Sequence, residues 1–113
     1  MTAPNNINAI PANLREQLLG DPWMHASCLS GRQPVQWHHA IIWRGKKLQE
    51  RFCIVPLTIE EHEIAREKKY ARMIDEVVLK RATEQDLERY PILFRNLLRR
   101  LDRKKNEKNT NNF

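Results

Sequence analysis

Three of the four histidines in the chain have a spacing that could bring their imidazole rings together. His38 and His39 are adjacent, and His62 follows 23 positions after His39. The segment between them is typical of a hairpin followed by the start of a helix, which can fold the three rings into one small pocket. One ring could activate a water molecule while two hold a divalent metal ion, and these two roles suffice to cleave a phosphodiester.

Histidine suits both roles because its ring titrates near neutral pH and its neutral nitrogen ligates metals. Adjacent residues on a regular strand point to opposite faces, so His38 and His39 can share a site only if the strand is distorted or one ring reaches around its edge. Two histidine ligands leave several metal positions open to water and phosphate. The sequence does not choose among Mg²⁺, Mn²⁺, Ni²⁺ and Zn²⁺. His25 has no partner pattern and is interpreted as structural or solvated.

Two β-prone runs must position the double histidine. Residues 35–43 form the first run and residues 52–57 the second, with a turn at 30–34 before them and a basic loop between them. This order predicts two short strands in a hairpin whose middle is irregular. Trp37 and Trp43 flank the histidines, and core packing is favoured for both over base stacking.

Helical patterns surround this hairpin. Thr58 and Glu61 form a capping box, which predicts a helix from residue 58 to about residue 80 with His62 in its first turn. A short helix is expected at 13–19, ended by Gly20, and another start at Thr83 with Asp86. The Tyr90-Pro91 pair breaks the chain before a final helix. Its apolar stripe consists of Leu93, Phe94, Leu97, Leu98 and Leu101.

The length of 113 residues suits one small domain. We expect an α+β fold with a flexible arm at 1–12, a single domain at 13–103 and a disordered basic and polar tail at 104–113. Within the domain, a two-strand and helix core occupies about 28–80 and C-terminal helices about 84–103. Apolar seams on those helices could also pair two subunits as a homodimer.

Positive charge is concentrated near the end of the chain. The net charge is +6, and from Lys80 onward ten Lys and Arg face five Asp and Glu, a net +5. This bias suggests a polyanionic partner, with a solubility tail as the alternative. No apolar run is long enough to span a membrane, and residues 1–10 are uncharged, unlike a secretion signal. We therefore expect no membrane partner and a cytoplasmic location, where Cys28 and Cys53 would be thiols or metal-bound.

Three fragments resemble the HNH endonucleases of the His-Me finger superfamily. Residues 28–31 (Cys-Leu-Ser-Gly) are similar to the segment that opens many such domains, and residues 36–40 (Gln-Trp-His-His-Ala) to the strand that carries the family's catalytic histidine. Residues 54–62, from Ile-Val-Pro-Leu to Glu-Glu-His, are similar to the segment in which an apolar run leads to a helical histidine. The resemblance covers residues 28–66, about a third of the chain, and implies a ββα-metal core.

The resemblance implies a metal-dependent endonuclease that hydrolyses DNA, of the small type found in phages and prophages. His39 matches the general base, while His38 and His62 match ligands of one divalent metal ion. The family's middle Asn is expected at the position of Cys53, which has no amide. The zinc-binding CxxC pairs of many HNH domains are absent. The alternative is a catalytically degenerate HNH-like module that binds nucleic acid or protein.

Basic residues near the histidines are candidates to hold the phosphate backbone, because backbone contacts place a substrate without reading its bases. The candidates are Arg44, Lys46, Lys47, Arg51, Arg66 and Lys69. Simple solubility is the competing explanation for the loop charges. A third interpretation combines Cys28, Cys53 and the histidines into a structural zinc site, although these spacings are wide and irregular. Cys53 would otherwise be a small core residue.

Overall fold

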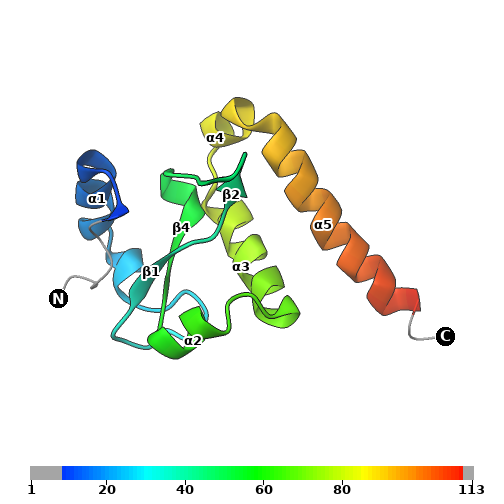
Figure 1. Cartoon of the computed structure of the whole chain (residues 1–113), viewed down its shortest axis with the longest axis horizontal. Helices are drawn as coiled ribbons and strands as arrows, with labels where there is room; N and C mark the ends of the chain where they lie inside the picture. Colours follow the sequence, from blue (N-terminus) through cyan, green and yellow to red (C-terminus); the bar gives the residue numbers. More distant parts are fainter. Residues whose placement is uncertain (1–8, 111–113) are drawn as a thin grey trace. The chain divides into compact units, whose positions relative to one another are not determined.

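The computed structural model describes residues 9–110, and side chains as far as Asp102 (Figure 1). The chain divides into two compact units, residues 1–81 and residues 82–113. The described residues form α-helices and two small antiparallel sheets. The α+β class predicted from the sequence is therefore confirmed.

Two strands that are distant in sequence form the main sheet of the first unit. β1 (Gln36–His39) pairs antiparallel with β4 (Ile54–Leu57), with His39 opposite Ile54. The two strands lie side by side in Figure 1. All four residues of β4 are buried, so this strand is the centre of the unit and β1 lies against it.

The connection between β1 and β4 contains a second, smaller hairpin. β2 (Ile42–Trp43) pairs with β3 (Lys46–Lys47) around a turn at Arg44 and Gly45, whose φ angles are 54° and 80°. Two successive positive φ values match the twist that a two-residue hairpin turn requires. The end of the first predicted strand and the predicted basic loop thus form a hairpin together.

Both predicted strands are wrong in their extent. The first is interrupted after His39, where the N–H of Ala40 bonds the carbonyl of Cys53 and Ile41 becomes buried. The second begins only at Ile54, because the preceding residues form a 3-10 turn, η3 (Arg51–Cys53). In both places the chain bends to bury a side chain, which a local β propensity does not reveal.

The helix predicted from residue 58 to about residue 80 is wrong, because it is divided in two. α2 (Ile59–Glu63) ends at Ile64, and α3 (Lys68–Arg81) begins after a turn. The capping box at Thr58 is confirmed, with both of its hydrogen bonds present. Ala65 is buried in the turn, and α3 then contacts β4 and η3. Packing of the turn thus outweighs the helical periodicity.

The N-terminal elements pack against β1. α1 (Ala12–Leu19) and the 3-10 turn η2 (Pro22–His25) contribute Leu18 and Met24 to a buried cluster with Trp37 and Ile54. The indole Nε1 of Trp37 donates a hydrogen bond of 2.9 Å to the carbonyl of Met24. The predicted core role of Trp37 is confirmed. Residues 1–8 of the predicted flexible arm lie outside the described residues, whereas Ile10 is buried.

One carboxylate ties η2 to the end of α3. Asp21 Oδ1 accepts a hydrogen bond from the N–H of Trp23, and Asp21 Oδ2 accepts from Arg81 at 2.9 Å and from Arg51 at 3.3 Å. The guanidinium of Arg81 also lies 4.0 Å from the centre of the Trp23 ring. Burial raises the pKa of Asp21, but these hydrogen bonds and the charge of Arg81 outweigh it and leave the pKa below its usual value.

Replacing this carboxylate should destabilise the fold. We expect Asp21→Ala to lower the free energy of unfolding by about 2–3 kcal/mol, because it removes a cap and leaves the mostly buried Arg81 without its carboxylate. Arg51→Ala is the matched control and should cost less than about 1 kcal/mol, because the Arg51 side chain is 51% exposed. Urea unfolding followed by tryptophan fluorescence measures both losses. Equal losses would show that the pairing with Arg81 is not the stabilising contact.

The second unit consists of two helices. α4 (Glu84–Arg89) begins at the predicted start, where Thr83 and Asp86 form a capping box, and α5 (Pro91–Thr110) begins at the predicted proline. Side chains of the predicted apolar stripe at Leu93, Phe94 and Leu97 are buried. The backbone of α5 continues to Thr110, and 111–113 lie outside the described residues, so the disordered tail stays a prediction.

Large apolar side chains remain exposed on both helices of the second unit, among them Leu87, Ile92 and Leu98. They do not identify a partner, and the homodimer stays a prediction. None of the helices in the described part of the chain combines the length and the apolar character needed to cross a bilayer.

Candidate active site

Two of the three predicted site histidines come together from different elements. His38 lies on β1, and His62 lies in α2 after the Thr58 cap. The centres of their rings are 5.0 Å apart, and the ring planes meet at 70°. This proximity brings residues 24 positions apart in sequence into side-chain contact. Both rings are only partly exposed.

The orientation of His62 is set by Gln36, two residues before His38 on β1. Nδ1 of His62 donates a hydrogen bond of 2.8 Å to Oε1 of Gln36. A neutral imidazole carries one proton, so this bond leaves Nε2 of His62 with its lone pair available. Metal-ligating histidines commonly have their other nitrogen held in this way.

Burial and neighbouring charges keep His38 neutral. Burial is the largest cause, followed by repulsion from His62, His39, Arg66 and Lys47, and together they lower the pKa of His38 to about 4. Burial, Lys47 and His39 also lower the pKa of His62. A neutral ring has a lone pair, so both histidines can act as metal ligands near neutral pH.

His39, the predicted base, lies at the end of β1 and is held by a different glutamine. Nε2 of His39 and Oε1 of Gln49 are 3.0 Å apart, and Nε2 of Gln49 donates to the carbonyl of Ala9 at 3.2 Å. His39 is close enough to both His38 and His62 to lower their pKa values through charge repulsion. His39 therefore interacts with the pair electrostatically, whereas His38 and His62 are in ring contact.

The helix that carries His62 is fastened to the loop before β1. Oε1 of Glu61 accepts hydrogen bonds from the hydroxyl of Ser27 and from the N–H of Thr58. The Ser27 hydroxyl oxygen in turn accepts from the N–H groups of Leu29 and Ser30. Glu61 is buried, and its carboxylate joins this loop to the first turn of the helix that carries His62.

The six predicted phosphate contacts separate into two groups. The charges of Lys47 on β3 and of Arg66 in the turn after α2 act on the imidazoles, since both lower the pKa of His38. The other four have partners elsewhere or lie on the surface. Arg51 pairs with Asp21, and Lys46 is exposed. Arg44 lies 5.7 Å from the centre of the Trp43 ring, and Lys69 lies 5.8 Å from the centre of the Tyr70 ring. Arg66 and Lys69 do not share a helix face with His62, because the predicted continuous helix is interrupted.

The two cysteines do not form a disulfide, and they differ in environment. Burial, with the nearby charge of Glu61, raises the pKa of the Cys28 thiol to about 11. Cys53 is fully buried in η3, as expected for a small core residue. Among the described residues, no three or more His, Cys, Asp or Glu side chains gather in a way that could hold a metal ion. The structural zinc site is therefore not found there, and the proposed nuclease metal would rest on the His38 and His62 pair.

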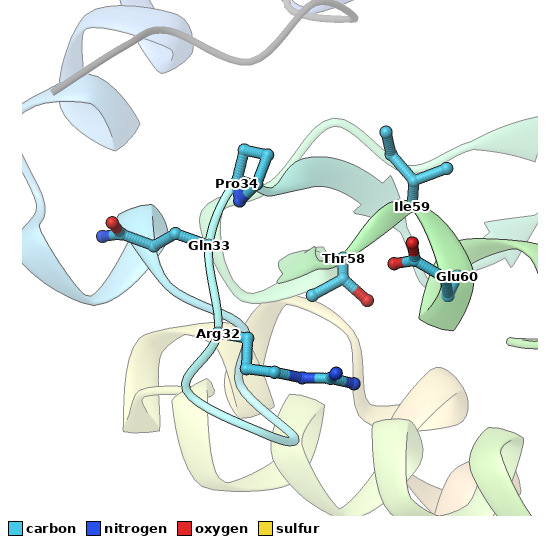
Figure 2. Close-up of a pocket in the computed structure, with 6 residues that line it drawn as sticks. All are labelled: Arg32, Gln33, Pro34, Thr58, Ile59 and Glu60. Carbon is cyan, nitrogen blue, oxygen red and sulfur yellow. The ribbon is translucent and has the colours of Figure 1, made fainter.

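A surface hollow lies at the start of α2. Figure 2 shows the residues around it, which are Arg32, Gln33, Pro34, Thr58, Ile59 and Glu60. None of the three histidines lines this hollow. The Thr58 hydroxyl in its lining caps α2, and Glu60 contributes a carboxylate, but the hollow contains no imidazole.

Neither glutamine of the site was among the predicted site residues. Gln36 could have been found, because residues two apart on a strand share a face and Gln36 therefore accompanies His38. Gln49 carries no local signal, since its partners are His39 and the distant Ala9. His25, interpreted as structural or solvated, is structural: it is buried and donates from Nε2 to the carbonyl of Leu19.

Comparison with known proteins identifies no relative of this chain. No protein-family model matches the chain, and no curated protein or solved structure matches it.

The depressed pKa of His38 predicts acid-sensitive stability. As the pH falls from about 6.5 towards 4, His38 binds a proton in the unfolded chain before it does so in the folded protein. The free energy of unfolding that is present above pH 6.5 is therefore progressively lost. We expect the free energy of unfolding in EDTA to drop by about 1–2 kcal/mol between about pH 7 and about pH 5. His38→Gln should remove much of that drop.

Urea unfolding of both proteins at the two pH values tests this prediction. The pKa values of Asp21 and Glu61 are also lowered, but from 3.8 and 4.5, so their contributions are lost at more acidic pH. An unchanged drop in His38→Gln would assign the acid sensitivity to another group, with His62 the next to test.

Proposed function

We propose that this protein is a metal-dependent endonuclease of the HNH type that hydrolyses DNA phosphodiester bonds. The observation that carries the proposal is the ring contact of His38 and His62, at 5.0 Å between centres. The order of β1, β4 and α2 supports a ββα-metal core, because the metal pair comes from the first strand and from the helix that follows the second.

His38 and His62 would hold the divalent metal ion. The pair fits this role because the pKa of each is lowered and because Gln36 holds His62 through Nδ1, leaving Nε2 for a ligand. When bound, the cation would supply positive charge to the phosphate and to the departing oxygen. Two protein ligands leave the remaining positions for water and phosphate oxygens.

His39 would act as the general base. Its ring takes a proton from the attacking water, whose oxygen forms a new bond to phosphorus while the bond from phosphorus to a sugar oxygen breaks. The departing oxygen gains a proton from solvent, and His39 returns its proton to solvent. Gln49 holds the ring of His39 for this transfer through Nε2.

The phosphate backbone would be held by the basic residues nearest the histidines. Lys47 and Arg66 are the first candidates because both influence the pKa of His38. Lys46 and Arg44, on the same hairpin as Lys47, would extend the contact along the strand. Such contacts neutralise phosphates and do not read sequence, so binding should weaken strongly as salt rises.

A plasmid-nicking assay tests the proposal directly. Supercoiled plasmid is incubated with the full chain in Mg²⁺, Mn²⁺, Ni²⁺ or Zn²⁺, with an EDTA arm and with His62→Ala prepared identically. We expect nicked product with at least one metal and none in EDTA. His62→Ala should need more metal, by about 10- to 100-fold, to reach half-maximal activity.

One observation favours the alternative of a degenerate module that binds without cutting. Cys53 stands where the family's middle Asn is expected, and it is a fully buried thiol in η3. A protein of this kind would bind DNA or a protein partner with equal affinity in Mg²⁺ and in EDTA and would yield no nicked plasmid. That result with every metal would reject the nuclease.

A further inference from the structure

Gln49 links the N-terminal segment to the base. It lies in the chain between β3 and η3, and its side-chain amide contacts two groups that are far apart in sequence. One is the backbone carbonyl of Ala9, 40 residues earlier, and the other is the ring of His39. We propose that Gln49 is a positioning residue that fixes the tautomer of His39. Its importance for cleavage rests on the proposed function.

The carbonyl of Ala9 decides which way the amide of Gln49 faces. A carbonyl oxygen only accepts hydrogen bonds, so the group of Gln49 that contacts it at 3.2 Å must be the donating nitrogen. The amide oxygen of Gln49 then faces Nε2 of His39 at 3.0 Å. That oxygen also only accepts, and Nε2 of His39 must therefore carry the proton.

The lone pair of neutral His39 is consequently on Nδ1. A neutral imidazole has a single ring proton, and Gln49 holds it on Nε2, so Nδ1 is the nitrogen that takes a proton from water. The site thus uses two glutamines on opposite ring nitrogens. Gln36 accepts from Nδ1 of His62 and leaves Nε2 bare, whereas Gln49 accepts from Nε2 of His39 and leaves Nδ1 bare.

The position of Gln49 also gives His39 a side-chain carboxamide as its hydrogen-bond partner. The thiol at Cys53 cannot hold an imidazole as a carboxamide does, and the Cys53 side chain is fully buried. Gln49 supplies a carboxamide to His39 from four positions earlier in the chain.

The test determines by NMR which ring nitrogen of His39 carries the proton in the full-length protein, and it does not depend on cleavage. Long-range proton–nitrogen correlation spectra of ¹⁵N-labelled protein are recorded in alkaline solution, at about pH 9, where free histidine side chains are neutral. The variants are Gln49→Met, which keeps the size but loses the amide, and Gln49→Glu, which keeps an accepting oxygen. Gln36→Met is the matched control, since Gln36 contacts His62.

We expect a single Nε2–H tautomer for His39 in the unmodified protein, in Gln49→Glu and in Gln36→Met. Gln49→Met should show a mixture of both tautomers with an unchanged melting temperature. In plasmid cleavage, Gln49→Met should lower kcat by about 10- to 100-fold with little change in KM, and Gln49→Glu should restore most of it.

The spectra and the cleavage assay separate the two proposals. A His39 pattern in Gln49→Met identical to that of the unmodified protein would overturn the role of Gln49, whatever the activity. The expected spectra together with no cleavage by any protein would reject the nuclease and leave Gln49 in control of the His39 ring.

Discussion

His39→Ala is expected to slow plasmid cleavage by about 100- to 10,000-fold, the contribution of a positioned general base. The variant leaves the ring contact of His38 and His62 and the hydrogen bond from His62 to Gln36 in place. The metal concentration for half-maximal activity should therefore stay the same. DNA affinity measured in Ca²⁺ or EDTA should change by no more than about twofold, because the phosphate contacts lie on other residues.

Two further variants make this result specific to proton transfer. His39→Gln keeps a polar side chain of similar length but cannot accept a proton from water near neutral pH, and it should be as slow as His39→Ala. His62→Ala should instead raise the metal requirement. Full activity in His39→Ala would remove His39 as the base, and a raised metal requirement in the same variant would make it a ligand.

Trp37→Ala is expected to lower the free energy of unfolding by about 3–5 kcal/mol. Trp37 is fully buried between Leu18, Met24 and Ile54, and its removal leaves a large cavity. It also leaves the carbonyl of Met24 without its indole partner, which adds the cost of an unpaired buried group. Since small domains have a stability of about 5–15 kcal/mol, this single change removes a large share of it.

Trp43→Ala is the matched control. Trp43 lies on β2 and is only partly buried, so its removal should cost about 1 kcal/mol. Urea unfolding followed by circular dichroism measures both variants. If Trp37→Ala does not fold, Trp37→Phe should still show a loss of about 1–2 kcal/mol from the missing hydrogen bond and volume. Similar losses at the two tryptophans would contradict the placement of the core at Trp37.

Local chemistry made parts of this fold predictable. Each capping box joins residues three positions apart, so the starts of α2 and α4 could be predicted from Thr58 with Glu61 and from Thr83 with Asp86. Pro91 likewise marks the start of α5. The contact of His38 with His62 was predicted from element order, because the second strand ends beside the start of the first and the helix with His62 begins there.

Features set by distant contacts could not be predicted in the same way. No glycine or proline marks the break at Ile64, which depends on burying Ala65. The bend after His39 depends on a hydrogen bond from Ala40 to Cys53. Gln49 was missed for the same reason, because its role exists only when Ala9 and His39 are brought together by the fold.

The buried carboxylate of Glu61 holds the first turn of α2 in place before any ligand binds. It lies immediately before His62 and joins the loop at Ser27 to the first turn of α2. Burial alone would raise its pKa, but the hydrogen bonds from Ser27 and Thr58 outweigh that and keep the pKa low. The imidazole of His62 is thereby preorganised. Binding of a phosphate would then cost little conformational entropy in α2, even in mildly acidic solution.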